Sequence, residues 1–257
     1  MSVLAQYVPV RQGEWHGWVW REHAAELTPI LLDQACCTPR PAAGGRGSVF
    51  SFTVAGIRGV LRKFRRGGMM RHCMPDHYLF DNRPLKEFSL TAELHAAGLP
   101  VPQPLGVCWR RRYGWFDGWI ATQELDAVDF VTRIRENKAS LPETLQRVGQ
   151  AICHMHDSGV YHADLNARNI LVSDTCVYLI DFDRGRRLTA MSSTRRAANL
   201  LRLRRSLRKM GAEAMYESVA SGYGPLRVPA WMESLYAIKC LASKPAQIHA
   251  CEKNEHA

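Results

Sequence analysis

The chain has 257 residues, of which 46% are hydrophobic, and a formal net charge of +10. This length allows one large domain or two lobes with a cleft, and the hydrophobic content allows a sizeable core. No run of about 18 apolar residues is present, and the N-terminus lacks the basic, apolar and small-residue order of a secretory signal. We therefore expect neither a membrane-spanning helix nor a secretory signal.

The eight cysteines do not form C-x-x-C pairs. Cys36 and Cys37 are adjacent, which suits neither a zinc site nor an ordinary disulfide. We therefore expect reduced thiols, some of them in the core, as is usual for cytosolic proteins.

The positive charge is concentrated in one segment. Residues 184–212 contain ten Arg or Lys side chains and no acid. Such a segment requires an anionic partner, which can be nucleic acid, acidic lipid or a phosphorylated substrate.

The first 40 residues include three tryptophans, Trp15, Trp18 and Trp20. They favour core packing over an aromatic patch at a membrane edge, because clustered aromatic side chains usually lie in cores.

The segment that follows has a clearer pattern. A glycine-rich turn containing Gly45 and Gly47 precedes two strands, which the alternation of apolar residues predicts at about 49–54 and 59–64. Glycines at such a turn let backbone N–H groups approach phosphate oxygens.

The second of these strands contains adjacent cations, Arg62 and Lys63. Only one of them can point toward a bound phosphate, because successive strand residues face opposite sides of a sheet. We favour Arg62 and keep Lys63 as the alternative register.

The apolar stripe of residues 82–97 predicts a helix that ends at Gly98 and Pro100. Glu87 in this helix is the predicted partner of the strand cation, and Glu93 competes with it.

A strand is predicted at 119–125, before a second, C-terminal half of the chain. There, Ser140 and Glu143 predict a capping box at the start of a helix that runs to about Ser158. His154 and His156 lie on different faces of that helix, so we interpret them as ordinary helix residues and not as metal ligands.

Residues 161–183 carry the candidate chemistry. Two apolar runs, at 170–172 and 177–180, flank a polar turn and predict a β-hairpin. Asn169 and Asp181 stand at its two open ends, and Asp164 lies on the loop that enters it. An amide oxygen and a carboxylate that meet in this way suit Mg²⁺, which prefers oxygen ligands and substrate phosphates. Asp164 could accept a proton from an attacking hydroxyl.

These motifs resemble the catalytic half of the protein-kinase-like superfamily. Residues 162–169 match the loop H-x-D-x-x-x-x-N, and Asp181-Phe182-Asp183 stands where D-F-G is expected. The resemblance implies an α+β fold forming one kinase-like domain of two lobes, with an N-lobe at about 1–125, a C-lobe at about 126–257 and an ATP site between them. It also implies that adenine meets the backbone near Glu124. His162 could be a general base, but the resemblance favours a structural role for it.

A helix is predicted at 195–210, rich in arginine outside its apolar stripe. No A-P-E motif follows Asp181, so we expect a small-molecule or lipid-linked acceptor and not a protein substrate. Several motifs are similar to those of the bacterial 3-deoxy-D-manno-octulosonic acid (Kdo) kinases, whose strand cation is Arg. They are found at residues 44–47, 60–69, 87–88, 99–102, 162–167, 181–185 and 199–209.

The resemblance to the Kdo kinases implies transfer of the γ-phosphate of ATP to the 4-hydroxyl of Kdo on a lipid A precursor, at the cytoplasmic face of the bacterial inner membrane. Asp164 would orient the hydroxyl and take its proton, Asn169 and Asp181 would hold Mg²⁺, and Arg62 with Glu87 would position the phosphates. Arg65, Arg66 and residues 184–209 would face the anionic acceptor or an anionic membrane. No nucleic-acid partner and no obligate protein partner are expected. The alternatives are a lipopolysaccharide heptose kinase, another small-molecule kinase of this fold, and a non-catalytic kinase-like binding protein.

Overall fold

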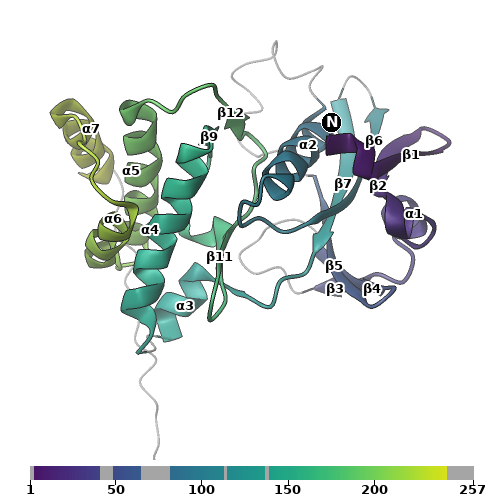
Figure 1. Cartoon of the computed structure of the whole chain (residues 1–257), viewed down its shortest axis with the longest axis horizontal. Helices are drawn as coiled ribbons and strands as arrows, with labels where there is room; N and C mark the ends of the chain where they lie inside the picture. The colour runs from purple at the N-terminus through teal and green to yellow at the C-terminus, as the bar shows by residue number, and fades with distance from the viewer. Residues whose placement is uncertain (1–2, 41–48, 65–81, 113–114, 137–138, 242–257) are drawn as a thin grey trace, which may run out of the picture. The chain divides into compact units, whose positions relative to one another are not determined.

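The computed structural model describes residues 3–40, 49–64, 82–112, 115–136 and 139–241. The chain separates into two compact units (Figure 1). Unit 1 contains residues 1–126 together with Ile180–Gly185, and unit 2 contains residues 127–179 and 186–257. The Asp-Phe-Asp segment therefore belongs with the N-terminal unit, although its neighbours in sequence belong to the C-terminal one.

A seven-stranded antiparallel sheet forms the centre of unit 1, in the order β1-β2-β6-β7-β5-β4-β3. Its strands are β1 (Tyr7–Gln12), β2 (Trp15–Trp20), β3 (Thr38–Arg40), β4 (Val49–Val54), β5 (Ile57–Lys63), β6 (Pro104–Arg112) and β7 (Trp115–Gln123). The predicted strands at 49–54, 59–64 and 119–125 are thus present, with shifts of a few residues at their ends. The large sheet and the helices described below confirm the α+β fold class.

The two faces of this sheet are covered by different helices. On one face, α1 (Ala24–Asp33) packs Leu27, Ile30 and Leu31 against alternate strand residues that include Leu61 and Ala121. On the other face, α2 (Arg83–Ala96) packs Phe88 and Ala92 against Val107 and Ile120. The period-two alternation of the strands separates the two cores.

The three N-terminal tryptophans lie in β2 and are partly buried against these two cores. The core interpretation of Trp15, Trp18 and Trp20 is therefore confirmed. Helix α2 begins as predicted after Asn82, whose side-chain oxygen accepts a hydrogen bond from the Leu85 N–H at 3.2 Å. This contact satisfies one of the unpaired donors of the first turn.

Unit 2 is mainly helical. Its helices are α3 (Phe130–Glu136), α4 (Leu141–Asp157), α5 (Ser193–Lys209), α6 (Tyr216–Tyr223) and α7 (Ala230–Leu241), with short 3₁₀ turns at Ala167–Asn169 (η4) and Glu213–Met215 (η5). Short strands complete it: β8 (Val128–Asp129), β9 (Val160–Tyr161), β10 (Ile170–Val172), β11 (Val177–Leu179) and β12 (Arg186–Arg187). The predicted hairpin is β10-β11, in which Ile170 is opposite Leu179.

Helix α4 packs very closely on α6. A Cβ added at Gly149 would lie 2.0 Å from the Val219 carbonyl oxygen, and one at Gly222 would lie 2.1 Å from the Gln146 carbonyl oxygen. Glycine at both positions therefore lets the two helix backbones meet.

The predicted capping box at Ser140 is wrong. Ser140 has helical backbone angles (φ −76°, ψ 0°), and its side chain makes no cap hydrogen bond, because N-cap side chains reach the first turn from an extended backbone.

Candidate active site

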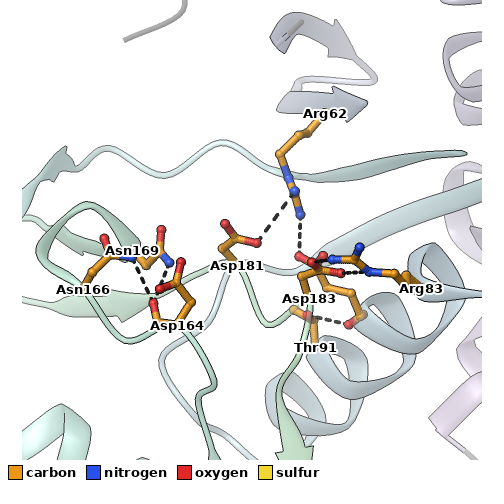
Figure 2. A network of polar contacts seen from close by, with 9 residues as sticks. Arg62, Arg83, Thr91, Asp164, Asn166, Asn169, Asp181 and Asp183 are labelled. Atoms are coloured by element: carbon orange, nitrogen blue, oxygen red, sulfur yellow. Dashed lines mark hydrogen bonds and ion pairs between the residues drawn. The ribbon is translucent and has the colours of Figure 1, made fainter. Parts of the chain in front are cut away.

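The strand cation is Arg62, and the alternation of β5 explains why. Leu61 packs toward α1, so Lys63 shares that face, where its ammonium lies 5.4 Å from the ring centroid of Trp119. Arg62 points to the opposite face, where α2 lies. Its Nη2 is 2.5 Å from Oε1 of Glu87, and Figure 2 shows the guanidinium directed at the α2 side. The two predicted partners therefore form an ion pair, and the register alternative with Lys63 is not the one observed.

Glu87 is almost completely buried, with 3% of its surface exposed. Burial raises the pKa of the Glu87 carboxyl above its usual range, and the charge of Arg62 opposes this shift. Burial also lowers the pKa of Arg62, but the carboxylates of Glu87 and Asp181 more than offset the effect and raise it overall. The two charges stabilise each other, and removal of Arg62 would leave the buried Glu87 carboxyl without the cation it is bonded to.

Asp181 lies on the second side of the same guanidinium. Its Oδ1 is 3.8 Å from Nη1 of Arg62 (Figure 2). Its backbone has φ +68°, a left-handed conformation that is uncommon outside glycine and is enriched at functional sites. Two residues later, Asp183 accepts a hydrogen bond from Nε of Arg83 at 2.8 Å. Unit 1 therefore holds the Asp-Phe-Asp segment to α2 through two arginines.

The loop that precedes the hairpin is ordered by its own polar side chains. Asn169 is fully buried at the end of η4, and its Nδ2 donates to the carbonyl oxygen of Asp164 at 2.9 Å. Asn166 donates to the same oxygen at 3.0 Å (Figure 2). The Asp164 carboxylate itself is exposed, with 65% of its side chain accessible, and Oδ1 lies 3.9 Å from Nη1 of Arg202. The loop therefore presents an accessible carboxylate beside a cation.

Helix α5 fixes this loop at two points that the sequence analysis missed. Asn199, fully buried, donates from Nδ2 to the His162 carbonyl at 2.9 Å and accepts from the His162 N–H at 3.2 Å. Further along the same face of α5, the Ser206 hydroxyl accepts a hydrogen bond from the Ala167 N–H at 3.1 Å. Positions 199, 202 and 206 follow the three- and four-residue spacing of one helix face. Polar residues at that spacing, beside the leucine stripe of the helix, were the sequence signal that could have indicated a polar contact face on α5.

His156 lies in α4 as a helix residue, in agreement with its interpretation, and it stands behind Asn199. It is fully buried, its Nε2 donates to Asn199 Oδ1 at 3.1 Å, and its Nδ1 accepts from the Tyr223 hydroxyl at 2.9 Å. Burial lowers the pKa of His156 to about 4, so the ring is neutral at physiological pH. His154, by contrast, is exposed.

His162 has the structural position that was preferred for it. It is fully buried, and its Nδ1 accepts a hydrogen bond from the backbone N–H of Asp164 at 3.2 Å. That contact ties the histidine to the turn that presents the Asp164 carboxylate.

The remaining predicted residues differ in how far the structure describes them. The Glu124 carboxylate pairs with Arg40, and its backbone N–H donates to the Arg58 carbonyl at 2.8 Å. Its role in adenine binding stays a prediction, and its N–H is already occupied by the sheet. Gly45 and Gly47 of the glycine-rich turn, and Arg65 and Arg66, lie outside the described residues.

The donors predicted for Mg²⁺ have suitable chemistry. Asn169 and Asp181 offer an amide and a carboxylate, which are the oxygen ligands that Mg²⁺ prefers. The register of β10 and β11 places Asn169 directly before one end of the hairpin and Asp181 two residues after the other. No group of three or more His, Cys, Asp or Glu side chains suited to a metal occurs in the described part of the chain. The chemistry of the two donors suits a cation of this kind, and the metal site stays a prediction.

Comparisons with known proteins agree with this chemistry. The model of the lipopolysaccharide kinase (Kdo/WaaP) family matches residues 41–223. A relative from Xylella fastidiosa (strain M12), named 3-deoxy-D-manno-octulosonic acid kinase, is 38% identical over 191 residues, which are 72% of this chain and 75% of the relative. A relative of the same name from Xanthomonas axonopodis pv. citri (strain 306) is 37% identical over 231 residues, or 85% and 91% of the two chains.

A solved structure, described as WaaP in complex with acyl carrier protein, matches the fold with a TM-score of 0.53 at 21% identity. The match covers 80% of this chain and 88% of that chain. This likeness shows the fold, which is protein-kinase-like. The family model and the relatives named as kinases define the class of protein, a phosphotransferase. Its acceptor group is an alcohol, and as a kinase it uses ATP. More narrowly, the chain belongs to the lipopolysaccharide kinase (Kdo/WaaP) family.

Proposed function

We propose that the enzyme phosphorylates the 4-hydroxyl of a Kdo sugar on Kdo-lipid A, with ATP as donor, during lipopolysaccharide core biosynthesis. The observation that carries this proposal is the exposed Asp164 carboxylate, held by a buried hydrogen-bond network and placed 3.9 Å from Arg202. The name shared by relatives that are 36–38% identical supports Kdo as the acceptor sugar.

Asp164 would orient the acceptor hydroxyl and accept its proton as the phosphoryl group is transferred. An exposed carboxylate is reachable by a bulky acceptor, and general-base catalysis of this kind contributes about 10²–10⁴-fold in rate. Arg202 would pair with an anionic group of the same acceptor, since Kdo carries a carboxylate and the lipid carries phosphates. Arg168, exposed on the same loop, adds a second cation on this side.

Arg62 would position the α- and β-phosphates of ATP, because its guanidinium is fixed by Glu87 and offers further donors in a planar fork. The backbone N–H groups of the turn with Gly45 and Gly47 would approach the phosphates. Asn169 and Asp181 would hold Mg²⁺, which neutralises phosphate charge when bound. The remaining catalysis is positioning and electrostatic stabilisation, as in other phosphoryl transfers.

The proposed place of work is the cytoplasmic face of the inner membrane, with the enzyme bound peripherally to an anionic surface. The charge of the chain supports it. The segment 184–212 carries ten basic side chains and no acid, and each Lys or Arg near an anionic membrane contributes about 1 kcal/mol.

Mass spectrometry of the lipid after incubation with protein, ATP and Mg²⁺ tests the proposal. We expect a mass gain of one phosphate on Kdo-lipid A and none on the same lipid without Kdo. A heptose-containing core lipid in a parallel reaction tests the heptose alternative. Phosphate gained only by the heptose-containing lipid would reject Kdo as the acceptor while leaving the kinase class intact.

A further inference from the structure

Three large apolar side chains point into solvent from α7. Trp231 is 57% exposed, Leu235 46% and Ile238 62%, and among the described residues these are the large hydrophobic side chains that remain exposed. Their spacings of four and three residues place them on one face of the helix. The helix thus carries a continuous apolar stripe on its outer side.

The opposite face of α7 is also apolar, but it is covered. Met232, Tyr236 and Cys240 pack against Ala197 and Leu201 of α5. Figure 1 shows α7 beside α5. The one acid of the helix, Glu233, is paired with Arg204 of α5, whose Nη1 lies 3.3 Å from Oε2. A helix that is apolar on both sides normally has both sides covered, so the outer stripe requires a partner.

Charge decides which partner fits. Residues 186–241 contain eleven Arg or Lys side chains and three acids. Arg227, shortly before α7, is exposed, and so is Lys239 on the helix itself. A second copy of this strongly basic region would be repelled by it, whereas an anionic lipid surface attracts it. Tryptophan with aliphatic side chains on one helix face, flanked by cations, is also the composition of helices that lie in a membrane interface.

We propose that the outer face of α7, formed by Trp231, Leu235 and Ile238, docks the protein on an anionic lipid bilayer. The helix lies in the plane of the interface, with the indole at the level of the headgroups and the aliphatic side chains below it. Basic side chains of the same unit remain at the headgroups and supply the preference for anionic lipid. The inference deepens the proposed membrane location, but it does not depend on which sugar accepts the phosphate.

Vesicle sedimentation with the full-length protein tests the inference, with vesicles of phosphatidylethanolamine and phosphatidylglycerol compared with vesicles of phosphatidylcholine. The triple variant Trp231→Ser, Leu235→Ser, Ile238→Ser should bind the anionic vesicles at least about tenfold more weakly, because three side chains lose their apolar burial. A matched variant, Trp231→Phe, Leu235→Met, Ile238→Leu, keeps an apolar face and should bind nearly as the wild type. Both variants should fold, since all three side chains are exposed, and unchanged thermal unfolding checks this.

Two results would overturn the inference. One is equal vesicle binding by the serine variant and the wild type. The other is a wild-type dimer in light scattering that the serine variant converts to a monomer, which would assign the face to a second copy. Phosphate transfer to the acceptor in detergent micelles is measured in parallel, so that loss of docking is distinguished from a wrong acceptor. The serine variant should keep that activity.

Discussion

The guanidinium of Arg62 lies 2.5 Å from the carboxylate of Glu87, within a cluster that also includes Asp181 at 3.8 Å. One cation thus links the sheet, helix α2 and the Asp-Phe-Asp segment. A change at any of the three should alter the other two, because they share one set of interactions.

Arg62→Ala should strongly raise the ATP requirement or lower turnover, whereas Lys63→Ala should be mild. The reason is that Lys63 faces Trp119 on the other side of the sheet. Glu87→Ala should resemble Arg62→Ala, and the double variant should be less than additive. Arg62→Lys should restore activity only in part, because a point charge cannot replace the planar fork.

Steady-state kinetics with varied ATP check these variants, with thermal unfolding as the control for folding. If Lys63→Ala is crippling and Arg62→Ala is silent, Arg62 has no role at the phosphates.

Asp181→Asn should weaken Mg·ATP binding and activity together, because it removes a carboxylate charge from the proposed cation site. Titration of activity with Mg²⁺ should show a higher half-saturating concentration than in the wild type. The matched control is Asp183→Asn, two residues later, which weakens a contact with Arg83. An Asp181→Asn enzyme with the wild-type Mg²⁺ dependence would remove Asp181 from the metal site.

Asn199→Ala should lower kcat by about 10–100-fold, because the backbone at His162 loses both hydrogen bonds and the carboxylate of Asp164 loses its fixed position. The KM for ATP should stay near the wild-type value, since Asn199 bonds to the backbone of His162 and to none of the side chains proposed to hold ATP or Mg²⁺. Asn199→Asp keeps an acceptor for the His162 N–H and should recover part of the loss. Equal losses for Asp and Ala, or a raised KM for ATP, would contradict the positioning role.

The stability of the protein should depend on pH through His156. Its pKa is lowered to about 4 in the fold, against about 6.5 in an unfolded chain. Between these values the unfolded state binds more protons, so stability is complete above about pH 6.5 and falls as the pH drops toward 4, by up to about 3 kcal/mol. Urea unfolding at pH 7.5 and pH 5 should show a smaller difference for His156→Gln than for the wild type. His154→Gln, at an exposed histidine of the same helix, should behave like the wild type.

Helices α2, α4 and α5, the hairpin and the Arg62–Glu87 pair could be predicted from the sequence because each rests on a local pattern. Alternation in β5 and the apolar stripe of α2 are sufficient to place Arg62 and Glu87 on facing surfaces. The hydrogen bonds between Asn199 of α5 and the backbone of His162 could not be predicted in the same way. They join residues 37 positions apart, and a buried asparagine in a helix gives no indication of its partner.

The N-terminal strands were also beyond prediction. In β1 and β2, arginine and histidine are mixed with tryptophan and valine, so neither strand shows a clean alternation. Their place in the sheet depends on pairing of β2 with β6, about 90 residues away. Non-local pairing of this kind determines which strands form this edge of the sheet. The predicted capping box at Ser140 is wrong for a different reason: the residue pattern is present, but the backbone of Ser140 is helical.

Nuclear magnetic resonance of the lipid product tests the central claim most directly, because it locates the new phosphate on the sugar. The account predicts a phosphate on the 4-position of Kdo, formed by the wild type with ATP. It also predicts a rate about 10²–10⁴-fold lower with Asp164→Ala at nearly unchanged ATP binding. A phosphate on another position or another sugar, or near-normal turnover by Asp164→Ala, would contradict it.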